Sequence, residues 1–149
     1  MADPAKFGYL RLEVYRLSHD LSLKMDSMTR KLPFLEKSKA ADQIQRSSKS
    51  VPALIVEGYA RRRHKAAWLN YLDQALGSAD ETRQHLECLF QTGVLKNSAE
   101  YSKLSAACEK LSAKLGAFIK GVEKHHSLPY YLRDCREPGS KNGNPARGP

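Results

Sequence analysis

The strongest constraint on the fold of this chain is a proline inside a stretch that otherwise has the pattern of one long helix. Residues 46–65 read RSSKSVPALIVEGYARRRHK, and Pro52 lies well inside them. An interior proline removes one main-chain hydrogen bond and clashes with the preceding turn, which costs about 3 kcal/mol. The hydroxyls of Ser47, Ser48 and Ser50 can bond carbonyl groups of that turn. We therefore expect a long helix that bends at Pro52 and packs tightly against its neighbours.

Apolar side chains recur at spacings of three and four in four segments, which is the pattern of one face of a helix. The segments are Tyr9–Leu32, a second that begins near Glu36 and contains Pro52, Ala66–Thr92, and a fourth that begins after Asn97 and Ser98. We therefore predict an all-α fold, an antiparallel up-down four-helix bundle over residues 1–126 with a kinked second helix. Residues 127–149 are rich in proline and glycine, and we predict that they form a flexible basic tail.

Several residues fix details of these helices. Gly93 is expected to end the third helix, and Asn97 or Ser98 to cap the start of the fourth. Gly77 lies inside the third helix at a cost of about 1 kcal/mol, which favours a close approach of another helix at that point. On the second helix the predicted core face contrasts with a solvent face of charged residues. The core face is Ile44, Ser48, Val51, Ile55 and Tyr59, and the solvent face is Lys39, Asp42, Arg46 and Lys49.

The composition, 41% hydrophobic and 28% charged over 149 residues, is typical of one soluble globular domain. No apolar run approaches the roughly 18 residues that span a bilayer, and the N-terminus lacks the pattern of a secretory signal. Cys88, Cys108 and Cys135 are widely spaced, so neither a disulfide framework nor a zinc knuckle is indicated. We expect a cytoplasmic protein with reduced thiols and no membrane partner.

The net charge of +9 is concentrated in one region. Residues 37–65 hold eight basic and two acidic side chains, a net charge of +6. Helix C-termini attract cations, by about 0.3 to 1 kcal/mol each, so a solvated helix end with local salt bridges is one interpretation of this cluster. The other interpretation is a surface that binds the phosphates of RNA or DNA. Its candidate residues are Arg61, Arg62, Arg63 and Lys65, with Arg46 and Lys49 as further contributors.

No helix-turn-helix, zinc-finger or aromatic RNA-binding signature accompanies these cations. Any binding should therefore depend on the backbone and shape of the nucleic acid, and it should weaken steeply with salt. The competing hypothesis is a purely structural oligomer whose partner is another protein and whose charge serves solubility. Tyr59, Trp68 and Tyr71 could stack on bases, but beside leucines at helical spacing they are more typical of a core or an interface.

A second set of residues is predicted to serve packing or assembly. Glu57 has no partner acid or base nearby in sequence, so it is better interpreted as a buried or interfacial acceptor than as a catalytic group. It could accept a hydrogen bond from the Ser47 or Ser50 hydroxyl of its own or a neighbouring subunit. The full predicted set is Ser48, Pro52, Glu57, Gly58, Tyr59 and Gly77.

Catalytic and metal-binding patterns are weak or missing in the sequence. His85 and Cys88 are three residues apart and share a helix face, but two ligands do not make a metal site. No glycine-rich phosphate loop, nucleophile elbow or metalloprotease helix is present. We therefore predict a protein that is not an enzyme and that has no cofactor and no metal.

Three stretches, taken in order, resemble the four-helix-bundle family of 23S ribosomal RNA intervening-sequence proteins. They are LEVYRLSHDLSLKM in the first helix, LPFLEKSKAADQIQRSSKSVPALIVEGYARR through the second, and WLNYLDQALGSADETRQHL in the third. The combination of Ser-Val-Pro, Glu-Gly-Tyr and Ala-Leu-Gly-Ser carries the resemblance, which covers roughly residues 9 to 124. The usual asparagine of the Pro-x-Asn-Ile segment is replaced here by Leu54, and the tail is not covered.

The resemblance implies a small non-enzymatic bundle that assembles as a ring of five subunits. A related branch of the family is the accessory variability protein of diversity-generating retroelements, where a basic pentamer binds the reverse transcriptase and nucleic acid. The resemblance therefore implies a homopentamer, with RNA or DNA and a reverse transcriptase as possible partners. The residues alone suit a monomer equally well.

Overall fold

Four long helices, preceded by one short turn of 3₁₀ helix, make up the part of the chain that the structure describes. The computed structural model describes residues 6–126, apart from the side chains of residues 34–38, so the predicted tail lies outside the described residues. The elements are η1 (Gly8–Arg11), α1 (Glu13–Arg30), α2 (Phe34–Ala60), α3 (Lys65–Gln91) and α4 (Ser98–His125). The predicted all-α fold is confirmed for these residues.

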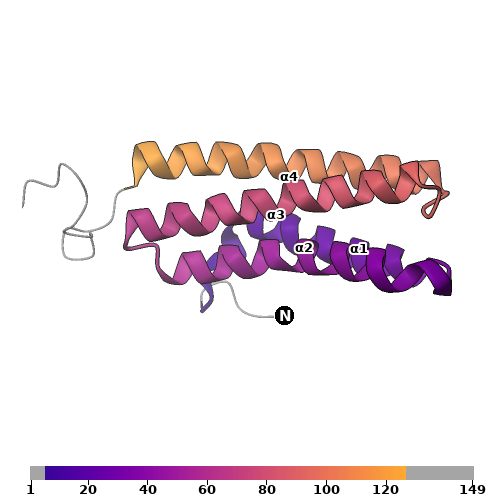
Figure 1. The fold of residues 1–149 in the computed structure, drawn as a ribbon. Helices are drawn as coiled ribbons and strands as arrows, with labels where there is room; N and C mark the ends of the chain where they lie inside the picture. The colour runs from indigo at the N-terminus through magenta and orange to yellow at the C-terminus, as the bar shows by residue number, and fades with distance from the viewer. Residues whose placement is uncertain (1–5, 127–149) are drawn as a thin grey trace, which may run out of the picture.

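The helices run antiparallel to one another in the order of the sequence, joined by short connections (Figure 1). Each helix packs on its neighbour in sequence, and α1 also packs on α4, which closes the bundle. The α2–α3 turn, the η1 segment and the C-terminal end of α4 therefore lie at one end of the molecule. This arrangement brings the basic cluster at the end of α2 close to both ends of the described chain.

Long aliphatic side chains from all four helices fill the interior of the bundle. The predicted apolar stripes face this core, and the predicted solvent face of α2 is exposed. Burial of this kind stabilises a fold by about 25 cal/mol for each Å² of apolar surface removed from water. The largest fully buried aliphatic side chains are Met25, Met28, Ile44, Val51, Ile55, Leu72, Leu86, Leu111 and Leu115.

Helix α2 continues through Pro52 without interruption, over 27 residues. The serine hydroxyls before the proline donate to carbonyl oxygens one turn earlier, as predicted. The acceptors are the carbonyls of Ile44, Gln45 and Ser47, at 3.3, 3.3 and 2.8 Å from the respective hydroxyl oxygens. The hydroxyl oxygens of Ser47 and Thr82 also lie 2.9 Å apart, which joins α2 to α3 inside the core.

The start of the first helix differs from the prediction. The helical pattern from Tyr9 onward corresponds to the 3₁₀ turn η1, and the backbone at Leu12 is extended before α1 begins at Glu13. The ring of Tyr9 packs against those of Tyr15 and Tyr59, with centroids 4.9 and 6.4 Å away. A Cβ on Gly8 would overlap the Tyr59 hydroxyl. These contacts hold the segment before α1 against the end of α2.

Gly58 and Gly77 differ in how closely a neighbouring helix approaches them. At Gly58 an added Cβ would lie 2.6 Å from the Cβ of Tyr71 and 2.7 Å from the Trp68 ring, so α2 and α3 are close there. At Gly77 an added Cβ would meet nothing within 4 Å. The prediction for Gly77 is therefore wrong within this chain, because that glycine faces outward on an exposed part of α3.

The predicted ends of the last two helices are confirmed. Gly93 adopts a φ of +78°, a left-handed conformation that glycine accepts without a side-chain clash, two residues after α3 ends. The side-chain oxygen of Asn97 accepts a hydrogen bond from the Glu100 amide at 3.0 Å and caps α4. Among residues 6–126, no helix is both long and apolar enough to cross a membrane.

Candidate nucleic-acid interface

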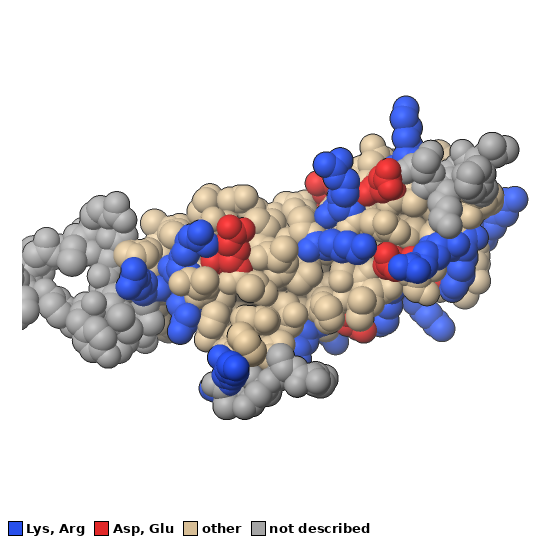
Figure 2. All heavy atoms as spheres, turned by 90° about the horizontal axis from the view of Figure 1, so that it is seen from below, with Lys and Arg blue, Asp and Glu red and all other residues tan. Residues whose placement is uncertain are grey.

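The basic cluster forms the turn between α2 and α3. The α2 helix ends at Ala60, Arg61 is its C-cap, and Lys65 is the first residue of α3. His126, just after α4, contacts this turn through its Nε2, which lies 2.6 Å from the carbonyl oxygen of Arg62. Figure 2 shows lysine and arginine side chains at both ends of the molecule, with acidic side chains beside them at each end.

Arg61 is held on the last turn of α2. Its Nη1 donates to the carbonyl oxygen of Glu57 at 3.1 Å and lies 3.8 Å from the Glu57 carboxylate. Its guanidinium carbon lies 5.2 Å from the centre of the Tyr71 ring. Arg61 therefore has a local salt bridge of the kind expected for a solvated helix end, and the Glu57 carboxylate offsets part of the charge of Arg61.

Arg62 is held even more closely, but without an acidic partner among the described residues. Its Nη1 donates to the carbonyl oxygen of Tyr59 at 3.0 Å, and its guanidinium carbon lies 4.1 Å from the centre of the Tyr59 ring. A cation stacked on an aromatic ring keeps its charge, because the ring attracts it only through its quadrupole. The turn therefore presents an exposed arginine with a fixed orientation and an undiminished charge.

The remaining cations of the turn are held more loosely. Arg63 is exposed and donates from Nε to Nε2 of His64 at 3.1 Å. Lys65 is half-buried at the start of α3. The turn thus contains four of the predicted cations, as their adjacency in sequence requires: Arg61, Arg62, Arg63 and Lys65.

A pocket of about 430 Å³ lies beside this turn, and we call it the basic hollow. The segment before α1 forms one wall, and the end of α2 forms the other. Among the described residues that line it, none has an acidic side chain. The lining residues are Lys6, Phe7, Gly8, Tyr9, Arg11, Tyr59 and Arg62.

Sequence reasoning did not identify Lys6, Phe7, Tyr9 and Arg11 as members of a site. The signal that could have found them is the interleaving of basic and aromatic residues in KFGYLR, directly before the first helix. Their proximity to Arg62 depends on how η1 folds back against α2, which no local pattern predicts. Tyr59, predicted as an assembly residue, lines the same hollow.

Arg46 and Lys49 do not adjoin the turn. They precede Arg61 by 15 and 12 residues on one helix, which places them roughly 18 to 23 Å away along its axis. Lys49 is paired with Asp26 of α1 at 3.2 Å. Arg46 lines a different pocket, between α2 and α3, together with Glu81 and His85. The six predicted cations therefore do not form one patch on a single chain.

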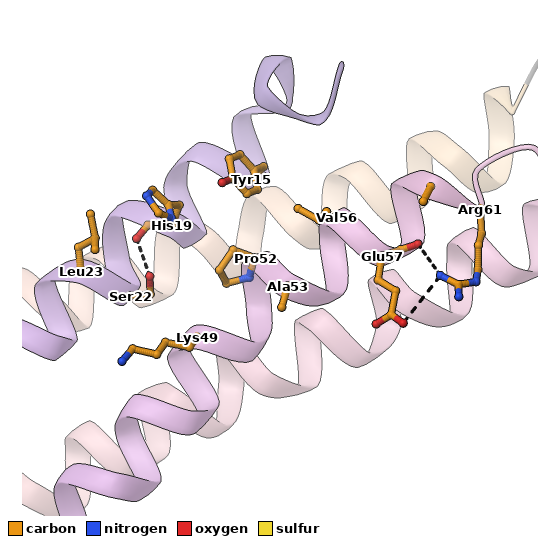
Figure 3. A pocket seen from close by; sticks show the side chains of 11 residues that line it. Tyr15, His19, Ser22, Leu23, Lys49, Pro52, Ala53, Val56, Glu57 and Arg61 are labelled. Carbon is orange, nitrogen blue, oxygen red and sulfur yellow. Dashed lines mark hydrogen bonds and ion pairs between the residues drawn. The ribbon is translucent and has the colours of Figure 1, made fainter. Parts of the chain in front are cut away.

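A shallow groove of about 720 Å³ runs along the outer side of α1 and α2, and we call it the α1–α2 groove. Figure 3 shows side chains of both helices along it, with Pro52 of α2 in its lining and the Glu57–Arg61 pair at one end. Leu23, which is 58% exposed, also lines this groove. Two residues of the predicted assembly set, Pro52 and Glu57, therefore belong to it.

Other predicted assembly residues lie elsewhere. Ser48 and Gly58 are buried within the chain, so they serve its own packing. Glu57 is not buried, since its side chain is 51% exposed and pairs with Arg61. Within this chain the hydroxyls of Ser47 and Ser50 donate to main-chain carbonyls instead of to Glu57.

Among the described residues, three ionisable groups have pKa values that their surroundings shift. Hydrogen bonds from Arg30 and Lys49 lower the pKa of Asp26. Partial burial, with a smaller contribution from Tyr9, raises the pKa of Tyr15 on the α1–α2 groove. Burial raises the pKa of the Cys108 thiol to about 12. His85, considered as a metal ligand, instead pairs with Glu81 at 3.1 Å. None of these groups forms a recognisable catalytic arrangement.

Comparison with known proteins gives a family and a related fold. A family model described as 23S rRNA-intervening sequence protein matches residues 11–117. A crystal structure from Bacteroides thetaiotaomicron, of a protein with unknown function from the S23 ribosomal protein family, is similar with a TM-score of 0.64. It is 24% identical, and the match covers 72% of this chain and 98% of that one. No curated protein matches this chain.

Proposed function

Because the chain belongs to the 23S rRNA-intervening sequence protein family, we propose that it is a non-enzymatic bundle whose basic turn binds the phosphate backbone of RNA or DNA. The observation that carries this proposal is the fixed arginine at the end of α2. Arg62 is oriented by the ring and the carbonyl of Tyr59, is exposed, and has no acidic partner among the described residues. Arg63 and Lys65 follow it directly in the chain.

Preorganisation favours binding by such a turn. A free arginine side chain loses up to about 2 kcal/mol of conformational freedom when it is immobilised on a ligand. Arg62 and Arg61 are already held on aromatic rings and on helix carbonyls, so less of that freedom remains to be lost. A planar guanidinium also fits phosphate oxygens in a bidentate manner. The turn therefore suits the recognition of a phosphate backbone without reading its sequence.

The experiment replaces the three arginines while it keeps their polarity. Arg61→Gln, Arg62→Gln and Arg63→Gln are combined in one variant, and binding to labelled structured RNA and to duplex DNA is measured over a range of salt. A control variant carries Lys96→Gln, Lys103→Gln and Lys110→Gln, which remove three exposed charges from the opposite loop and from α4. Both variants have the same net charge, so a difference between them reports the position of the charge.

For the wild type, the logarithm of affinity should fall linearly with the logarithm of salt, by about 0.7 to 0.9 per phosphate contacted. The arginine variant should lower that slope by about 2 to 3 for each subunit bound, and the control should change it much less. Equal losses in both variants would mean that only net charge matters. No binding of the wild type at low salt would contradict the proposal.

A second candidate function is assembly, and the α1–α2 groove favours it. An exposed leucine beside proline, alanine and valine side chains is the kind of apolar surface that interfaces cover. We propose that copies of the chain associate through this groove, which would place several basic turns on one particle. A protein partner such as a reverse transcriptase is a further proposal, based on the resemblance alone.

Light scattering tests the assembly proposal. Leu23→Lys and Val56→Lys would place charges in the α1–α2 groove, whereas Leu69→Lys would place one elsewhere, on the partly exposed side of α3. We expect the two groove variants to lower the particle mass and to keep the helical circular dichroism spectrum. A wild type that is monomeric at high concentration would contradict assembly.

A further inference from the structure

The basic hollow differs from the rest of the surface in the kinds of side chain that line it. Three cations, Lys6, Arg11 and Arg62, lie around one pocket with three aromatic residues, and none of the described lining residues is acidic. Acidic side chains accompany the cations in each of the other two pockets described above. A pocket of this composition attracts an anion and offers flat surfaces at the same point.

Some of the planar side chains that line the basic hollow keep a face open to solvent. The ring of Tyr59 is covered on one face by the guanidinium of Arg62, and the rings of Tyr9 and Trp68 lie at steep angles to it. Because Arg62 is exposed, the outer plane of its guanidinium is available for stacking. Phe7 is 41% exposed, with the ammonium of Lys6 5.7 Å from the centre of its ring.

We propose that the basic hollow binds one unpaired nucleotide of a strand whose backbone lies on the basic turn. The base stacks on the planar side chains of Phe7 and Arg62, and its phosphate is bound by Lys6 and Arg11. This inference rests on the proposed function and adds a preference for single-stranded segments. Aromatic rings and arginine planes are the surfaces on which proteins stack unpaired bases.

The size of the hollow agrees with this ligand. Its volume of about 430 Å³ lies near the lower end of the range of small-ligand sites, roughly 300 to 1,000 Å³. A paired base inside a duplex has both faces covered by its neighbours, so it cannot stack on protein without leaving the helix. The hollow should therefore add affinity only where the strand is unpaired.

The test compares a single-stranded RNA that contains one 2-aminopurine with the same strand in a duplex, at one salt concentration. We expect tighter binding of the single strand, with quenching of the 2-aminopurine fluorescence. Phe7→Leu should lower the ratio of the two affinities by roughly 5- to 150-fold, the range that stacking of one base gives. Phe7→Tyr, which keeps a ring, should restore the ratio. Phe90→Leu serves as the control, because Phe90 stacks on Tyr101 near the opposite end of the bundle.

The outcomes separate this inference from the proposed function. Salt-dependent binding with equal affinity for single strand and duplex would overturn nucleotide binding in the basic hollow. It would leave the proposal of backbone binding by the basic turn intact. No binding to either nucleic acid would overturn both. Adenosine monophosphate should not displace the labelled strand at concentrations comparable to that of unlabelled strand, because it lacks the contacts of the turn. Equal displacement by both would instead identify a site for free nucleotides and overturn the strand proposal.

Discussion

The guanidinium of Arg62 lies on the ring of Tyr59, 4.1 Å from its centre, and donates to the carbonyl oxygen of the same residue. Tyr59 is half-buried, and its ring lies nearly perpendicular to that of Trp68 in the core, with centroids 6.2 Å apart. One side of this tyrosine therefore belongs to the packing of the bundle, and the other side orients a surface cation. The relationship links the core, the end of α2 and the proposed binding surface.

Arg62→Lys should separate charge from planarity at this position. A lysine keeps the positive charge but lacks the flat guanidinium that stacks on Tyr59 and on a base. We expect the salt dependence of duplex binding to stay near that of wild type, while affinity for a single strand falls several-fold. Arg62→Gln should lower both. Titrations with the two nucleic acids measure the effect, and a lysine variant that matches wild type on single strands would contradict stacking at Arg62.

Two glycine substitutions should have opposite effects on stability. Gly58→Ala puts a Cβ 2.6 Å from the Cβ of Tyr71, so we expect a loss of about 1 to 3 kcal/mol from overpacking. At Gly77, in the middle of α3, an added Cβ meets nothing within 4 Å. Gly77→Ala should therefore stabilise the protein by up to about 1 kcal/mol, because alanine favours a helix more than glycine does. Urea denaturation followed by circular dichroism measures both. Equal effects of the same sign would contradict the packing described for α2 and α3.

Asp26 should make stability depend on pH in the acid range. Its pKa is lowered by hydrogen bonds from Arg30 and then Lys49, so the folded state favours the carboxylate. The contribution is present above the unfolded pKa, near 3.8, and is lost as the pH falls through the lower folded pKa. We expect wild type to be more stable than Asp26→Asn at pH 6 and the difference to shrink towards pH 3. Urea denaturation at a series of pH values measures this, and a constant difference would contradict the prediction.

The two described cysteines should differ strongly in reactivity. Cys108 is fully buried with a pKa of about 12, so almost no thiolate forms at pH 8, whereas Cys88 is exposed. The experiment uses Cys135→Ser, because Cys135 lies outside the described residues. A thiol reagent should modify one cysteine quickly in native buffer and the second only in denaturant. Rapid modification of both would mean that the core opens readily around α4.

Much of the fold follows from local patterns. The apolar spacing predicts the four helices to within a few residues, and Gly93 and Asn97 mark two of the ends correctly. The start of the first helix was predicted wrongly because Tyr9 and Leu10 continue the helical spacing. Their position is decided by contacts of Gly8 and Tyr9 with Tyr59, far away in sequence.

The candidate site is less predictable from the sequence. The basic turn is visible because its charges are contiguous. The basic hollow is not visible in the sequence, because it combines Lys6 and Phe7 with residues more than fifty positions later in the chain. Glu57 and Gly77 show the same limit: whether a helical residue faces a neighbour, a salt bridge or open space depends on how the helix is rotated in the bundle.

The central claim, that the basic turn binds nucleic-acid backbones, is tested most directly by a salt titration of RNA binding. Wild type is compared with the Arg61, Arg62 and Arg63 glutamine variant and with the matched lysine variant, on samples of known particle mass. We predict a steep linear salt dependence that is reduced only by the arginine substitutions. An affinity that is insensitive to salt, or equally reduced in both variants, would contradict it.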